Sequence, residues 1–211
     1  MLKYTSDKKI FGICAALLAA ALTLLPFTGY FAASRQVRDD VVRLHVLADS
    51  DDEADQRIKL KVRDAVLENA SALFGDASDA DNAKTQIGSN LALLTQTANS
   101  VLEAEGVPYR ATAQLTYEYF DTRAYGDLTL PAGRYAALKI VLGSGEGQNW
   151  WCVVFPPLCL PAAEGTAAAV FSEDEMTVLR PSEGYRIRFK LAEIAAEIAE
   201  KWRKRNNEMN N

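Results

Sequence analysis

The sequence contains few of the residues that most enzymes use for chemistry. Its 211 residues include one histidine, His45, and three cysteines, Cys14, Cys152 and Cys159. A cysteine hydrolase needs a thiolate beside a base, so His45 would have to serve Cys152 or Cys159. Cys152 lies in an apolar segment, which keeps a thiol protonated and unreactive. We therefore do not expect cysteine catalysis.

Patterns for metals, phosphates and nucleic acids are also missing. A zinc site needs Cys or His ligands in closely spaced pairs, and the chain has none. The glycine-rich run at 143–147 lacks the Gly-Lys-Ser/Thr of a phosphate loop and leads into a predicted strand. The net charge is −5, and the first 33 residues carry +2, so the rest carries −7 without a basic stripe. We expect no cofactor, no metal and no nucleic-acid partner.

The N-terminus has the features of an export signal. Three lysines among the first nine residues precede an apolar run from Ile10 to Ala33, and small residues surround Ser34. Cleavage after Ser34 would remove this segment as a signal peptide. The run also reaches the roughly 20 residues that an uncleaved membrane anchor needs. Both alternatives predict a signal or anchor at 1–34, an exported domain at 35–205 and a frayed tail at 206–211.

Periodicity along the exported part predicts a single α+β domain. Alternating apolar residues predict strands at 41–47, 110–120, 135–142 and 150–155, and helical spacing predicts helices at 51–74, 79–105 and 185–205. Ser50 and Glu53 form a capping-box pattern ahead of the first helix. The last helix has an apolar stripe of Ile187, Leu191, Ile194, Ile198 and Trp202. Short turns between the later strands favour an antiparallel meander. The order β-α-α-β-β-β-α therefore indicates helices packed on a mostly antiparallel sheet.

The segment from Gly143 to Cys159 is the most unusual part of the chain. Its glycines allow positive φ in a tight, exposed turn. Trp150 and Trp151 are adjacent, so in a strand they must point to opposite faces, and only one can enter the core. The other suits partner recognition, unless a helix or the loop at 156–182 covers it. Cys152 and Cys159 could form a disulfide outside the cytoplasm.

Two long motifs resemble those of the stage II sporulation protein R family. The first is V-R-L-H-V-L-A-D-S-D at 42–51, which runs into D-Q-R-I-K-L-K-V-R-D-A-V-L at 55–67. The second is Y-G-D-L-T-L-P-A-G-R-Y-A-A-L-K-I-V-L-G-S-G-E-G-Q-N-W-W-C-V-V-F-P-P-L-C at 125–159. The run Y-R-I-R-F-K-L-A-E-I at 185–194 is similar to the family's last helix. The resemblance covers roughly residues 40 to 200, and Asp49 stands where the family has asparagine.

This resemblance implies a messenger of sporulation that is not itself an enzyme. It implies export across the forespore membrane into the intermembrane space facing the mother cell. There the family activates a membrane-embedded aspartic protease, which cleaves the precursor of the mother-cell sigma factor. We expect the partner-binding surface to contain Gly145, Glu146, Gln148, Asn149 and Trp150, with His45, Asp49 and Asp51 as a second edge.

Two other functions stay open from the sequence. An exported wall or peptide hydrolase could use two carboxylates, with Glu146 on its glycine loop as the best acid among Asp49, Asp51, Asp127 and Glu146. A structural scaffold of the septal space would bind several proteins without stimulating proteolysis.

Overall fold

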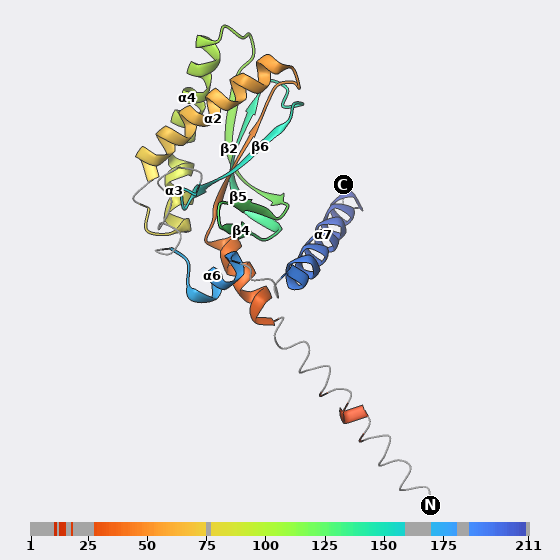
Figure 1. Cartoon of the computed structure of the whole chain (residues 1–211). Helices are drawn as coiled ribbons and strands as arrows, with labels where there is room; N and C mark the ends of the chain where they lie inside the picture. Colours follow the sequence, from red (N-terminus) through yellow and green to blue (C-terminus); the bar gives the residue numbers. More distant parts are fainter. Residues whose placement is uncertain are drawn as a thin grey trace, which may run out of the picture.

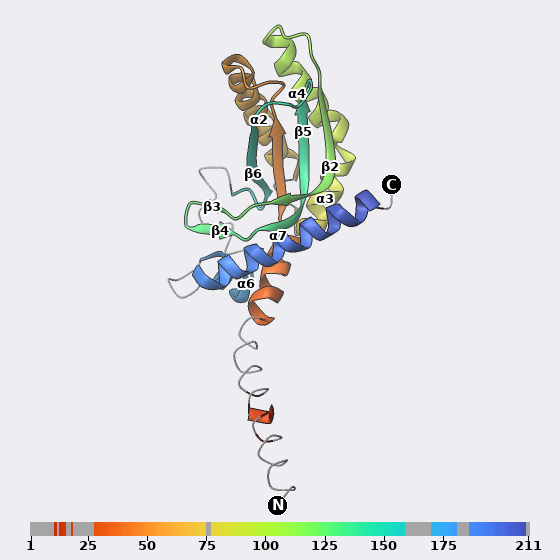
Figure 2. The same cartoon turned by 90° about the vertical axis from the view of Figure 1, so that its right-hand side faces the viewer.

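The chain folds into a four-stranded sheet, a separate two-stranded hairpin, and helices that pack around them (Figures 1 and 2). The computed structural model describes residues 11, 13–15, 18, 28–74, 77–158, 170–180 and 186–209. In chain order the elements are β1 (Val42–Leu47), α2 (Glu53–Phe74), α3 (Ala80–Ser89), α4 (Leu91–Ala104), β2 (Ala111–Phe120), β3 (Arg123–Tyr125), β4 (Leu128–Leu130), β5 (Gly133–Leu142), β6 (Asn149–Phe155), α6 (Glu173–Leu179) and α7 (Arg186–Met209). A further helix at residues 28–39 precedes β1. The α+β class is confirmed.

The main sheet contains both parallel and antiparallel strand pairs, and β1 lies inside it between β5 and β6. The strand order is β2-β5-β1-β6, with β1 parallel to β5 and antiparallel to β6. β2 pairs antiparallel with β5 along its whole length. The predicted meander is wrong, because the loop at 143–148 passes over the end of β1 instead of joining neighbouring strands. Six residues easily cover the roughly 10 Å between strands that are two positions apart.

Helices α2, α3 and α4 cover one face of the sheet and form the larger core. Ile58, Val62 and Val66 of α2 are buried, as their helical spacing predicts. They pack with buried residues of α4 and with the alternate residues of β1 that point to this face. The buried set also includes Leu44, Val46, Leu94, Ala98, Leu102, Leu138 and Ile140.

Three helix boundaries differ from the sequence-based expectation. The helix predicted at 79–105 is broken at Asn90, whose backbone N–H caps α3 while α4 begins at the next residue. The prediction of a Ser50–Glu53 capping box is wrong. The Ser50 hydroxyl instead accepts a hydrogen bond from the Asp52 N–H at 3.1 Å and donates one to the Asp55 carboxylate. α7 continues to Met209, beyond the predicted end at Arg205.

The opposite face of the sheet is covered at one end by the β3–β4 hairpin, α6 and helix 28–39. Beneath the hairpin lies Arg43, which is fully buried. Its Nε donates to the Cys152 carbonyl at 3.2 Å and its Nη2 to the Tyr125 hydroxyl at 2.6 Å. The guanidinium also lies 4.3 Å from the centre of the Phe120 ring. Burial lowers the pKa of Arg43, although the neighbouring tyrosines oppose this shift.

Helix 28–39 packs against α6 and crosses the predicted domain boundary. Tyr30 and Ala33 are buried and form a cluster with Val178. Ser34 is 1% exposed, so residues on both sides of the predicted cleavage position belong to one packed helix. Among the parts of the chain that the structure describes, no helix is both long and apolar enough to cross a membrane. Most of the predicted apolar run lies outside the described residues.

Asp40, just after this helix, makes the fold sensitive to pH. Burial and the neighbouring Glu175 carboxyl of α6 raise the pKa of Asp40 to about 6. A carboxyl with a raised folded-state pKa stabilises the fold while it is protonated. Its contribution is therefore complete below the ordinary pKa of 3.8 and is lost as the pH rises to about 6.

Asp40→Asn should raise the melting temperature by a few degrees at about pH 8, because the amide removes the repulsion between the two carboxyls. Near pH 4 the substitution should change the melting temperature little, because the Asp40 carboxyl is then already protonated. Thermal unfolding across this pH range measures the effect, with Glu68→Gln on the exposed face of α2 as the control. An equal effect of Asp40→Asn at both pH values would contradict the assignment.

Candidate partner-binding site

Hydrogen bonds join the loop at 48–52, which follows β1, to the glycine loop at 143–148, which precedes β6. The Asp49 carboxylate accepts a hydrogen bond from the Ser144 N–H at 2.6 Å, and its carbonyl accepts from the Glu146 N–H at 3.1 Å. The Asp51 carboxylate accepts from the Gln148 N–H at 2.8 Å. The two predicted edges of the surface are therefore parts of one assembly, in which Asp49 and Asp51 hold the glycine loop. An asparagine at position 49 could accept the same bond through its side-chain carbonyl.

The glycines of this loop are needed for its shape. Gly143 and Gly145 have φ values of 55° and 68°, which confirms the predicted positive-φ turn. A Cβ on Gly147 would lie 2.2 Å from the carbonyl oxygen of Ser50, so this position permits close approach of the two loops.

Helix α2 supports the same loop through Lys59. The Lys59 ammonium donates to the Gln148 carbonyl at 2.9 Å and to the Gln56 side chain at 2.5 Å. Burial lowers the pKa of Lys59, while Asp51 opposes this shift. The Gln148 backbone is thus held from both sides, and the side chains of Glu146 and Gln148 remain exposed. This combination gives the loop a fixed, polar outer surface.

The adjacent tryptophans point to opposite faces of the sheet, as predicted. Trp150 is 36% exposed, and the Arg63 guanidinium of α2 lies 4.3 Å from the centre of its ring. Trp151 is half-buried on the other face and stacks on His45 with 3.7 Å between ring centres. Helix α2 therefore covers Trp150 only in part, which leaves an aromatic edge beside the glycine loop.

His45 lies at the centre of a polar cluster on the face of the sheet opposite α2, α3 and α4. Its Nδ1 lies 2.6 Å from the Glu118 carboxylate, and its Nε2 lies 2.6 Å from the side-chain oxygen of Asn149. Lys139 donates to the other oxygen of Glu118 at 2.5 Å. Burial would raise the pKa of Glu118, but the bonds from His45 and Lys139 outweigh it and lower that pKa. His45 is 4% exposed, so it holds Asn149 and Trp151 in place and offers almost no surface itself.

Among the residues that the structure describes, no cysteine lies beside His45. Cys152 is in register with Leu44 and belongs to the helix-covered core, whereas His45 points to the opposite face. Cys152 is disulfide-bonded and Cys14 is free. Cys159 lies outside the described residues, so the Cys152–Cys159 pairing stays a prediction. Within the described part of the chain, no group of His, Cys, Asp or Glu could hold a metal ion.

A shallow pocket lies on the edge of β6 next to the glycine loop. Its lining residues are Arg123, Gln148, Asn149, Trp150 and Trp151. Arg123 comes from the β3–β4 hairpin, which folds back over the sheet and was not expected from the sequence. Sequence reasoning also missed Lys59 and Arg63, because charged residues at helical spacing usually mark a solvated face.

The fold and the site define an α+β domain with a hydrogen-bonded polar loop surface and one exposed aromatic edge. Comparison with known proteins gives its family. A model described as stage II sporulation protein R matches residues 38–164, and the chain belongs to this family. Stage II sporulation protein R of Bacillus subtilis strain 168 is 34% identical over 172 residues, which cover 82% of this chain and 74% of that relative. No solved structure matches. The protein therefore has a role in sporulation.

Proposed function

We propose that this chain is an exported messenger that activates a membrane-embedded aspartic protease during sporulation. The activated protease then processes the precursor of the mother-cell sigma factor. The observation that carries the proposal is the interlocked pair of loops, which presents Glu146, Gln148 and Trp150 on a fixed backbone. Family membership supplies the context of sporulation. The arrangement suits recognition of a protein surface better than turnover of a substrate.

Activation by a ligand requires a difference in affinity between two states of the receptor. The chain must bind the active state of the protease more tightly than the inactive one. A surface that is already rigid loses little conformational entropy on binding, so more of its contact energy remains for this discrimination. Trp150 is suited to the anchoring role, because large aromatic residues at the centre of an interface often dominate its binding energy.

The N-terminal segment directs the domain to the outer face of the forespore membrane in this proposal. Helix 28–39 is packed on α6 through Tyr30 and Ala33, so the domain begins within the last residues of the predicted apolar run. Removal of residues 1–34 would also remove this packed surface. We therefore favour a chain that keeps helix 28–39 and stays near the membrane that contains the protease.

A photo-crosslinking residue at Gln148 tests the proposed contact. It should form an adduct with the protease in sporulating cells, because Gln148 is exposed and lines the pocket on the edge of β6. The same residue at Gln96, which is exposed on α4, is a matched control and should form none. Adducts at Gln96 and none at Gln148 would contradict the assigned surface. Immunoblots for the chain and the protease identify the product.

A further inference from the structure

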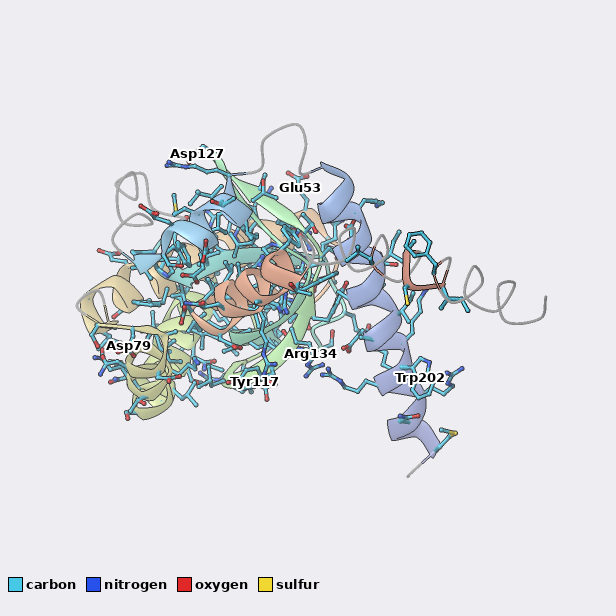
Figure 3. All side chains as sticks on the ribbon, turned by 90° about the horizontal axis from the view of Figure 1, so that it is seen from below. Glu53, Asp79, Tyr117, Asp127, Arg134 and Trp202 are labelled. Carbon is cyan, nitrogen blue, oxygen red and sulfur yellow. The ribbon has the colours of Figure 1, made fainter. Side chains whose placement is uncertain are left out.

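The large apolar side chains that the structure describes on α7 point away from the domain. Ile194, Ile198 and Trp202 are 44%, 55% and 59% exposed, and Met209 near the C-terminal end of the helix is 70% exposed. Figure 3 shows Trp202 pointing outward from the body of the protein. An apolar stripe of this spacing usually faces a core. Here the described residues of the predicted stripe face outward, and the side chains of Ile187 and Leu191 lie outside the described residues.

The opposite side of α7 makes the contact with the domain. Ala196, Ala199 and Glu200 line a pocket that they share with β5 and helix 28–39. The Glu200 carboxylate lies 3.3 Å from the Arg134 guanidinium and is largely buried. The helix is therefore attached through the Arg134–Glu200 ion pair, and turning its apolar face inward would break that pair. The outward direction of the apolar stripe follows from this attachment.

Basic residues accompany the exposed stripe. α7 contains seven Arg or Lys and four Glu, a net charge of +3 in a chain whose net charge is −5. Lys201 and Arg205 continue the line of Ile194 and Ile198 at helical spacing, and both are exposed. The Arg205 guanidinium lies 5.3 Å from the centre of the Trp202 ring. Apolar and aromatic residues flanked by Lys and Arg are typical of helices that lie in an anionic membrane surface.

The position of α7 favours a lipid surface over other occupants. Its inner face and Phe31, Ser34 and Arg38 of helix 28–39 line the same pocket, so the two helices are neighbours. In Figures 1 and 2, α7 runs crosswise to helix 28–39. In the proposed arrangement helix 28–39 leads into the predicted N-terminal anchor along the membrane normal, so a helix crosswise to it lies along the membrane plane. Basic charge on an otherwise acidic chain complements anionic headgroups.

We propose that the face of α7 formed by Ile194, Ile198 and Trp202 binds an anionic lipid surface beside the N-terminal segment. This contact fixes the orientation of the domain on the membrane. The inference goes beyond the proposed protease activation and does not depend on it, since its test contains no protease.

Trp202 fluorescence tests the proposal in the full-length chain reconstituted into vesicles. Subtracting the emission of Trp202→Phe from that of the unmodified chain isolates the Trp202 signal. In vesicles containing phosphatidylglycerol, this signal should be blue-shifted and strongly quenched by brominated lipid. In vesicles of phosphatidylcholine alone, the quenching should weaken. Quenching that does not depend on lipid charge would overturn the anionic preference.

A second variant separates membrane contact from folding. Ile198→Glu places a charge on an exposed position, so circular dichroism should not change, while quenching of Trp202 by the lipid should be lost. Gln96→Glu on exposed α4 is the control and should keep the quenching. If Trp202 in the unmodified chain is unquenched by brominated lipid, the proposal fails. Chemical crosslinking of that sample into dimers would then assign the face to a second copy of the chain.

Discussion

Alanine at Glu146, Gln148 and Trp150 together should abolish activation of the protease while the chain remains folded and exported. The three side chains are exposed, and the loop that carries them is held by backbone bonds to Asp49, Asp51 and Lys59. Truncating an anchor tryptophan commonly costs 2 kcal/mol or more. With two polar contacts also lost, we expect a total of about 4 kcal/mol, which corresponds to roughly a thousandfold weaker binding.

The readout for this triple variant is cleavage of the sigma-factor precursor in sporulating cells. Immunoblots of the chain verify its export, and thermal unfolding of the purified chain verifies its fold. The matched control replaces Glu68, Leu93 and Gln96, which are exposed on the helix layer, by alanine. Full activation by the Glu146, Gln148 and Trp150 variant would show that this surface does not bind the protease.

Arg43→Ala should destabilise the chain by about 3 kcal/mol. The substitution leaves a cavity beneath the β3–β4 hairpin and removes the bonds that join Arg43 to the Cys152 carbonyl and the Tyr125 hydroxyl. It also removes the contact with Phe120. The hairpin that supplies Arg123 to the surface should loosen as a result, so activation should weaken along with stability.

Two further variants show which property of Arg43 matters. Arg43→Lys keeps the charge but lacks the planar group that stacks on Phe120 and donates in two directions, so it should remain clearly destabilised. Arg43→Met fills more of the cavity than alanine does and buries no charge. It should therefore recover part of the free energy of unfolding that Arg43→Ala loses. Denaturant unfolding gives the free energies. If Arg43→Ala unfolds with the same free energy as the unmodified chain, the buried guanidinium does not stabilise the hairpin.

Elements governed by local periodicity could be predicted from the sequence. The helical spacing of Ile58, Val62 and Val66 and the strict alternation of β2 depend on neighbouring residues alone. The central position of β1 could not be predicted, because strand order depends on contacts between distant segments. The burial of Arg43 was missed for the same reason, since its aromatic neighbours come from β2, β3 and β5.

Only those parts of the site that depend on local sequence patterns could be predicted. The glycine spacing and the two tryptophans indicated an exposed turn and an aromatic edge, and both are present. The holding role of Asp49 and Asp51 required knowledge that the β1–α2 and β5–β6 loops meet. The outward stripe of α7 was missed because periodicity shows that a helix has an apolar face but does not show which way that face points.

Cleavage of the sigma-factor precursor in membranes that contain the protease and its substrate tests whether this chain activates the protease. The full-length chain is either present on the outer face of those membranes or absent. We expect processed sigma factor only when the chain is present, and we expect its amount to rise with the amount of chain until it saturates. Equal processing with and without the chain would contradict the claim that this protein is the activating messenger.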